Sequence, residues 1–298
     1  MRRLSLLLPE RRRLAGQALS PEVGRALARA DHEVAAAGDE SAQLRRYFKL
    51  SQSAWPLAAM TRQLDVGDAG DALWLRADPV RVQPDMTGVR LLAYGDLGLG
   101  ADHAAQLAEL LQPVFAEHGW QLSAPHPQRW YLRLPADLHL PHFAPPERVL
   151  GDDLFEHLPD GADARRWRAL LNDTQVLLHQ QAEAGGTRAA NSLWFWGAGR
   201  LPERIEGRID ALESDEADLR ALAMLAEAGE GSDGHRLIDL RDARDWSRVE
   251  AQSLLSALRE LRRGELGELT LDFADGCLLR VRASQRWRFW RKPLATLA

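Results

Sequence analysis

The middle of the chain shows the clearest alternation of apolar and polar positions. Segments 73–82 and 88–95 alternate or run apolar over short stretches bounded by Pro, Asp and Gly, which predicts strands of a meander. Residues 101–119 place leucines on one side of an amphipathic helix, and a second long helix is expected over 162–181. Two further short strands are expected between these helices.

The stretch 189–202, AANSLWFWGAGRLP, concentrates aromatic residues before a Gly-x-Gly turn. A period of two places Trp194 and Trp196 on one side of a strand, with a leucine and a phenylalanine on the other side. Because both faces are apolar, the pattern predicts a core strand covered on both sides. The alternative is a strand that delivers Asn191 or the glycine turn to a cleft. A dinucleotide-binding loop is not expected, because Pro202 stands where its helix would begin.

The two ends of the chain give a different pattern. Residues 1–64 predict a helical segment, with Ser20 as the N-cap and Pro21 as the first residue of a helix that ends at Gly38. The C-terminal part predicts a helix near 215–228, a strand at 235–241, a helix over 246–263, a hairpin turning at Asp275 and Gly276, and a terminal strand over 285–292.

These elements divide the chain into three expected parts: a helical N-terminal segment (1–64), an α/β domain (65–205), and a C-terminal α/β region with a terminal hairpin and a basic aromatic strand (206–298). Strands and helices are mixed and several hairpins are antiparallel. The fold class expected is therefore α+β, or α/β with mixed sheets.

Composition narrows the function. The chain has 298 residues, 45% of them hydrophobic and 27% charged, as folded globular proteins do. Its formal net charge of -5 argues against broad nucleic-acid binding. Cys277 is the single cysteine, so no intramolecular disulfide can form, which fits a reducing cytoplasm. No run of 18 apolar residues occurs, so a cytoplasmic protein without a membrane span is expected.

Motifs for catalysis are missing from the sequence. His139 and His142 lie three residues apart, but Pro141 between them prevents a regular helical presentation. There is no HExxH pattern, no acidic calcium loop and no Gly-x-Ser-x-Gly elbow. Neither a catalytic residue, a metal nor a cofactor is therefore expected.

A ligand site can still be placed on the second long helix. Asn172, Gln175 and His179 are spaced i, i+3, i+7 and share one helix face. This stripe predicts either a pocket wall or a satisfied buried polar network. The full set of candidate ligand-binding residues is His142, Arg148, Asn172, Gln175, His179, Asn191, Trp194, Trp196, Gly197 and Gly199.

The C-terminal stretch 285–292, QRWRFWRK, interleaves arginines with aromatic residues. Arg286, Arg288 and Arg291 are candidates for contact with an anion or a nucleic acid, because guanidinium groups hold phosphates while aromatic rings stack on bases. The alternative is an edge strand with its aromatic face on the core and its arginines in solvent.

Two known groups resemble this sequence. The segments RWYLRLP (129–135), VLGDDLFEHLPDGADARRWRALLNDTQVLLH (149–179) and NSLWFWGAGRLP (191–202), with the ending QRWRFWRKP, resemble the RpfE-type regulatory proteins, bacterial proteins usually described without a biochemical activity. The similarity covers most of the chain from about residue 70. It implies a regulatory protein.

The span 130–202 also resembles, more distantly, the substrate-covering domain of archaeal-type cofactor-independent phosphoglycerate mutases. The counterparts are Gly151 with Asp152, His179, and the run from Asn191 to Pro202. That resemblance implies a metal-dependent phosphoseryl mechanism, carried by a separate core with an Asp-Gly pair near the N-terminus, a nucleophilic serine and His/Asp ligands. The sequence offers no counterpart for those core residues.

The function expected is therefore a non-catalytic cytoplasmic regulatory or ligand-binding protein with a mutase-like cover fold. The alternatives are a cofactor-independent phosphoglycerate mutase or related metal-dependent phosphotransferase, and a module that docks a protein or nucleic acid through its C-terminal Arg/Trp strand. A small phosphorylated ligand or a protein is the partner expected, and neither a membrane nor a nucleic acid is.

Overall fold

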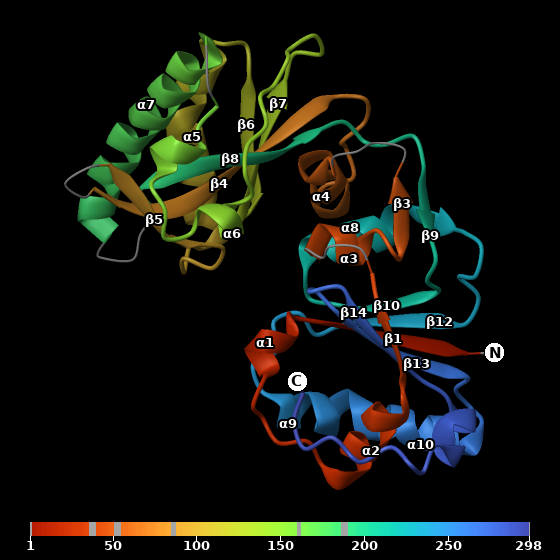
Figure 1. Cartoon of the computed structure of the whole chain (residues 1–298). Helices are drawn as coiled ribbons and strands as arrows, with labels where there is room; N and C mark the ends of the chain where they lie inside the picture. Colours follow the sequence, from red (N-terminus) through yellow and green to blue (C-terminus); the bar gives the residue numbers. More distant parts are fainter. Residues whose placement is uncertain are drawn as a thin grey trace. The chain divides into compact units, whose positions relative to one another are not determined.

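The chain folds into two compact units. The structure, a computed structural model, describes residues 2–35, 40–50, 55–84, 88–159, 162–185 and 190–297. Unit 1 combines Met1–Ser51 with Arg204–Ala298, and unit 2 is Gln52–Glu203. Unit 2 is thus continuous in sequence, whereas unit 1 is built from both ends of the chain (Figure 1).

Unit 2 contains a five-stranded antiparallel sheet organised around the long strand β4 (Leu73–Pro84). Along one edge β4 pairs with β8 (Ser192–Gly199). Along the other edge its first half pairs with β7 (Arg129–Leu134) and its second half with β5 (Val89–Tyr94). Strand β6 (Gln121–His126) extends the sheet beyond β7. The strands expected from the alternating pattern are confirmed.

Helices cover both faces of this sheet. They are α4 (Leu57–Asp65), α5 (Ala101–Ala116), α6 (Pro146–Val149), the 3₁₀ helix η1 (Leu154–His157) and α7 (Ala162–Gly185). Figure 1 shows α5 and α7 side by side. Leu107, Leu111 and Phe115 of α5 are spaced at successive turns and are all buried, so one stripe of this helix packs into the core.

Unit 1 contains a six-stranded mixed sheet in the order β10-β12-β1-β13-β14-β2. The strands are β1 (Arg3–Leu8), β2 (Asp31–Val34), β10 (Ala211–Glu213), β12 (His235–Asp239), β13 (Glu268–Phe273) and β14 (Cys277–Val281). Strands β10, β12, β1 and β13 run parallel, and β14 and β2 are antiparallel. A small sheet, β11-β9-β3, consists of β3 (Phe48–Leu50), β9 (Ile205–Gly207) and β11 (Ala226–Ala228).

Alternation along the strands gives the large sheet of unit 1 one apolar face. Leu4, Leu6 and Leu8 of β1 point into a core that helices cover. The helices of unit 1 are α1 (Arg11–Leu14), α2 (Pro21–Arg29), α3 (Glu40–Leu44), α8 (Ala217–Leu225), α9 (Trp246–Val249), the π-helical turn η2 (Glu250–Leu254), α10 (Leu255–Arg263) and the 3₁₀ helix η3 (Ala283–Trp287). Figure 1 shows α2, α9 and α10 together on one side of this sheet.

The mixed α+β fold class is confirmed, but the helical segment predicted over 1–64 is wrong. The short apolar run that begins at Leu4 forms β1, a strand with parallel neighbours on both sides. Such buried strands read as continuous apolar runs without alternation, so their sequence resembles that of a helix. Ser20 and Pro21 do begin a helix, which ends at Arg29 instead of Gly38, a position outside the described residues.

The three-part division of the chain also differs from the observed one. The structure places the boundaries after residues 51 and 203 and joins the two ends in unit 1. Sequence patterns are local, so they cannot reveal that β1 pairs with strands more than 200 residues away. Among the described residues, no helix is both long and apolar enough to cross a bilayer.

Candidate functional site

The polar stripe predicted on α7 faces away from the core. Asn172 and His179 are exposed and Gln175 is half-buried. His142 and Arg148, expected to face this stripe, are exposed as well. The stripe is therefore not a satisfied buried network, and its role in ligand binding stays a prediction.

Asn191 and the Gly-x-Gly turn have structural contacts. The Asn191 side chain accepts a hydrogen bond from the Val82 amide (2.8 Å) and donates one to the Val82 carbonyl (2.9 Å). Gly197 has a φ of +66°, and Gly199 has a φ of +153° with a would-be Cβ only 2.5 Å from the Cβ of Pro56. These glycines allow the backbone of β8 to lie close to the start of α4, where a Cβ atom would clash.

The two tryptophans of β8 lie in the core of unit 2. Trp194 is fully buried and donates its indole N–H to a backbone carbonyl (2.9 Å). Trp196 donates to Asp78 Oδ2 (2.7 Å), which also binds Nη2 of Arg76 (2.7 Å). Asp78 Oδ1 accepts from Arg76 Nε (2.9 Å) and the Trp130 amide (3.0 Å). We call these four residues, Arg76, Asp78, Trp130 and Trp196, the Arg76 cluster; they form a closed, satisfied core network.

A second ion pair lies nearby in unit 2. Arg129 binds both oxygens of Asp65, at 2.7 and 2.8 Å, and Tyr131 donates its hydroxyl to the same carboxylate (2.6 Å). Burial opposes ionisation of Asp65, but these hydrogen bonds outweigh it and lower the pKa. Burial raises the pKa of Tyr131, which therefore keeps its proton.

Unit 1 contains a buried Ser–His pair. Ser5 Oγ lies 2.9 Å from Nε2 of His235, whose Nδ1 lies 2.8 Å from the carbonyl of Arg208. Burial lowers the pKa of His235, so the neutral ring donates to that carbonyl and accepts from Ser5. The spacing resembles that of a nucleophile and its base. However, Ser5 is only 3% exposed, so a substrate cannot reach its hydroxyl and the pair is structural.

The carboxyl ends of the parallel strands are the usual ligand site in sheets of this kind. Here three carboxylates near that edge are bonded to arginines. Arg11 holds Asp275 (2.7 Å) and Arg241 holds Asp239 (2.8 Å). Asp272, fully buried near the end of β13, is bonded to another arginine and to a tyrosine. Within the described part of the chain, no group of three or more His, Cys, Asp or Glu residues is placed to hold a metal ion.

The C-terminal stretch provides the most distinctive surface of the molecule. We call residues 286–292 the aromatic–arginine segment. Trp287, Phe289 and Trp290 expose 65%, 75% and 68% of their surface. Large aromatic side chains usually lie in the core, so three of them exposed within four residues form an unusual apolar patch.

The segment is held by contacts on both sides. Nη1 of Arg288 donates to Asp31 (2.6 Å) and to the carbonyl of Arg29 (2.8 Å). The hydrogen bond to Arg288 lowers the pKa of Asp31, so the pair stays ionised at neutral pH. Beyond the segment, the Leu294 amide donates to the Gly24 carbonyl (3.1 Å). These contacts anchor the segment to α2 and β2 while its aromatic rings stay exposed.

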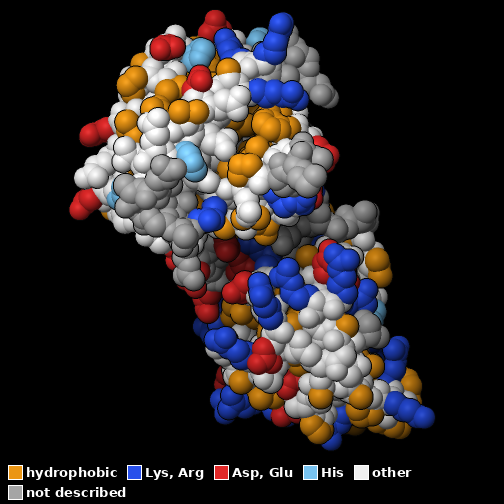
Figure 2. Space-filling view, turned by 90° about the vertical axis from the view of Figure 1, so that its left-hand side faces the viewer, with side chains coloured by type: hydrophobic (Ala, Val, Ile, Leu, Met, Phe, Trp, Pro, Cys, Tyr) orange, Lys and Arg blue, Asp and Glu red, His pale blue; other side chains and the backbone are white. Residues whose placement is uncertain are grey.

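A pocket of about 540 Å³ opens beside the exposed rings. It is lined by Ala30, Asp31, His32, Arg288, Trp290 and Arg291. On the face shown in Figure 2, the part of the molecule that belongs to unit 1 carries many Lys and Arg side chains with hydrophobic side chains among them. The site combines apolar contact area with positive charge.

The sequence identified this stretch but not its conformation. The predicted terminal strand is wrong: Ala283–Trp287 is the 3₁₀ helix η3, and no strand follows it in the described chain. Arg286 and Arg291 are exposed, whereas Arg288 is half-buried and ion-paired. Trp287 and Phe289 do not pack on the core, because the segment has no neighbouring strand to bury one of its faces.

Comparison with known proteins relates the chain distantly to cofactor-independent phosphoglycerate mutases. No family model matches it. A probable 2,3-bisphosphoglycerate-independent phosphoglycerate mutase from Geobacter sulfurreducens is 36% identical over 63 residues, which are 20% of this chain and 16% of that protein. The match therefore spans only a small part of the mutase.

Two solved structures align with most of the chain at low similarity. The cofactor-independent phosphoglycerate mutase from Thermoplasma acidophilum is 15% identical, with 94% of this chain and 89% of that chain covered and a TM-score of 0.41. The PH0037 protein from Pyrococcus horikoshii is 10% identical, with 94% and 87% covered and a TM-score of 0.45.

Proposed function

We propose that this chain is a non-catalytic binding protein on a mutase-like scaffold, which docks an acidic protein segment through its aromatic–arginine segment. The regulatory role and the RpfE-type relationship implied by the sequence resemblance belong to this proposal, as does a cytoplasmic location. The observation that carries it is the exposure of Trp287, Phe289 and Trp290 beside an arginine-lined pocket.

The chemistry of the segment favours a protein partner. Trp and Arg are enriched at the centres of protein interfaces, where they supply most of the binding energy. Arg286 and Arg291 carry positive charges that the acidic side chains of a partner would neutralise.

The proposal that the chain is non-catalytic has independent support. Asp275 and Asp239, at the ligand edge of the parallel sheet, are bonded to arginines, which compete with a cation for the same oxygens. The candidate nucleophile–base pair of unit 1, Ser5 with His235, is buried. No resident metal or cofactor is proposed.

Docking is tested with a fluorescein-labelled peptide of alternating Glu and Tyr, measured by anisotropy, with a Lys/Tyr peptide as the charge control. The Glu/Tyr peptide is expected to bind, and Trp287→Ala with Trp290→Ala should abolish binding. Met224→Ala removes another exposed apolar side chain (48% exposed) elsewhere in unit 1 and should leave binding unchanged. Preference for single-stranded oligothymidine, or equal binding of the Lys/Tyr peptide, would refute the acidic-protein partner.

The alternative function is a phosphoglycerate mutase, favoured by the 36% identity over 63 residues to a probable mutase. Elemental analysis of the purified protein and an assay with 3-phosphoglycerate in the presence of manganese separate the two. Absence of turnover is expected. Turnover that depends on manganese would overturn the non-catalytic proposal.

A further inference from the structure

Unit 1 contains a second pocket, which is lined by no residue of the aromatic–arginine segment. It has a volume of about 340 Å³ and is lined by Arg2, Arg236, Ser256, Arg259, Glu260, Arg263 and Glu265. Four arginines against two glutamates leave a formal charge of +2 in this pocket, although the whole chain carries -5. We propose that it binds a small ligand that carries a phosphate dianion.

Sheet geometry brings two of these arginines together. Arg236 lies in β12 opposite Leu4 of β1, and Arg2 precedes β1 by one position. Arg2 and Leu4 are two residues apart, so they project from the same face of the sheet as Arg236. Arg2 and Arg236 therefore lie on the same face of the sheet as the buried leucines of β1, at the amino end of the strands.

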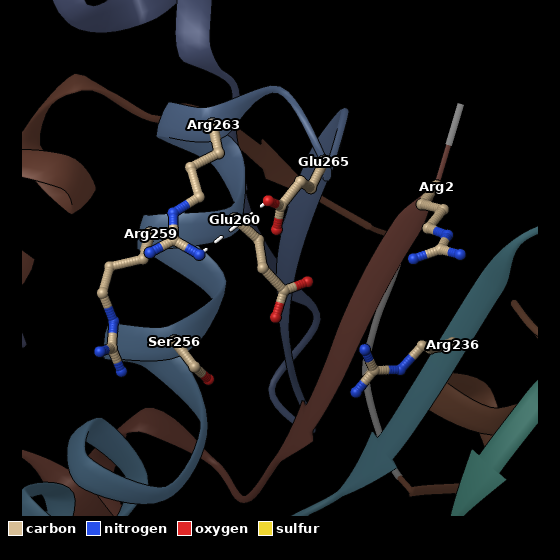
Figure 3. Close-up of a pocket in the computed structure, with 7 residues that line it drawn as sticks. All are labelled: Arg2, Arg236, Ser256, Arg259, Glu260, Arg263 and Glu265. Carbon is tan, nitrogen blue, oxygen red and sulfur yellow. Dashed lines mark ion pairs between the residues drawn. The ribbon is translucent and has the colours of Figure 1, made fainter.

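Helix α10, with Glu265 just after its end, supplies the opposite wall. Ser256, Glu260 and Arg263 are spaced i, i+4, i+7, so they lie on one stripe of the helix. Figure 3 shows Ser256 and Glu260 pointing from the helix toward the strands, with Glu260 projecting into the space in front of Arg2 and Arg236, whereas Arg259 and Arg263 lie at the outer side of the helix.

The arginines retain donors for a ligand. Arg263 lies 4.0 Å from Glu265, and Arg236 lies 3.4 Å from Glu213 in a pair whose side chains are 44% and 65% exposed. Exposed pairs of this length contribute little energy. A cation at the C-terminus of a helix is stabilised by the helix dipole, which accounts for Arg263 at the end of α10. The dipole does not account for Arg2 and Arg236 on the strand side.

The chemistry of the wall selects the ligand. Guanidinium groups offer paired N–H donors that match phosphate oxygens, and arginine stays charged at all physiological pH values. A volume of about 340 Å³ lies at the low end of the range for small-molecule sites. It exceeds what a bare phosphate fills, so a small phosphomonoester also fits.

Calorimetric titration of the full chain with inorganic phosphate tests the proposal, with chloride salt held constant. Saturable binding of one phosphate per chain is expected, with a dissociation constant below about 1 mM. Arg236→Gln should weaken binding at least tenfold. The matched control, Arg262→Gln, removes the same charge from α10 outside the pocket, where Arg262 is paired with Glu22 (2.6 Å), and should leave binding unchanged.

A gain of affinity provides the sharper test. Glu260→Gln removes a negative charge that faces the ligand, so phosphate should bind several-fold more tightly, an effect that misfolding cannot mimic. Absence of binding, equal weakening by Arg262→Gln, or weaker binding to the Glu260→Gln protein would each overturn the proposal. Tighter binding of glycerol 2-phosphate than of phosphate identifies a phosphomonoester, and equal binding identifies free phosphate. These variants leave residues 286–292 intact, so their outcome is independent of the proposed docking function.

Discussion

Replacement of Asp78 by asparagine should destabilise unit 2 severely. The Asp78 carboxylate accepts four hydrogen bonds, two of them from Arg76, and the side chains of the pair are 9% and 4% exposed. The asparagine side chain would have the size of the aspartate but no charge. One carboxylate oxygen would be replaced by an NH2 group, a donor that would face the N–H donors of its neighbours. The Arg76 guanidinium would then be a buried cation without its counterion.

The expected cost follows from this geometry. Removal of one partner from a buried ion pair typically costs about 3–5 kcal/mol, mainly because the remaining charge stays desolvated. Domains are stable by only about 5–15 kcal/mol, so the variant would approach the limit of folding. Arg76→Met removes the stranded charge. The double variant Arg76→Met, Asp78→Asn should therefore be more stable than Asp78→Asn alone.

Urea unfolding of the full chain measures the loss of stability, and hydrogen exchange of peptides from β4 and β8 shows whether the loss lies in unit 2. Asp137→Asn, a substitution of the same type at an exposed position, should change the free energy of unfolding by less than about 0.5 kcal/mol. A cost below about 1 kcal/mol for Asp78→Asn, or strictly additive costs in the double variant, would show that the buried pair is not the source of stability.

Three further outcomes are expected. Iodide should quench the tryptophan fluorescence mainly through Trp287 and Trp290, and the double variant Trp287→Phe, Trp290→Phe should lose most of that quenching; unchanged quenching would place these rings in the core. Burial lowers the pKa of His235, so as the pH falls below about 6.5 the unfolded chain binds a proton at this residue before the folded chain does, and stability should decline. His235→Gln should reduce this decline in circular-dichroism melts, and a variant whose pH profile matches that of the unchanged protein would contradict the reasoning. Gly199→Ala should cost about 1–3 kcal/mol in urea unfolding, because its φ of +153° disfavours a Cβ, whereas Gly100→Ala has open space and should cost less than about 1 kcal/mol; equal costs would argue against strain.

The sequence predicted unit 2 well because its signals are local. The long amphipathic helices and alternating strands of this unit are continuous in the chain, and the apolar faces of the strand at Trp194 correctly indicated a strand covered on both sides. Unit 1 was harder because its central strand, Arg3–Leu8, is short and has its partners near the other end of the chain.

Prediction of the sites had a similar limit. The aromatic–arginine segment is contiguous, so its composition drew attention to it, although exposure of Trp287 requires knowledge of the neighbouring elements. The second pocket of unit 1 joins Arg2, Arg236 and residues of α10, which no spacing rule connects. The stripe at Asn172 was predicted from spacing but is exposed or half-buried, because helical spacing identifies a shared face but not the direction in which that face points.

The position of β1 in the middle of the large sheet constrains how the protein emerges from the ribosome. Its neighbours on both sides, His235–Asp239 and Glu268–Phe273, are made more than 200 residues after it. At about 5–20 residues per second, an apolar N-terminal strand waits on the order of ten seconds or more for them, while the inserted Gln52–Glu203 body can already fold. Until then the leucines of β1 have no neighbouring strands, and loss of β12 and β13 would leave β1 unpaired as well.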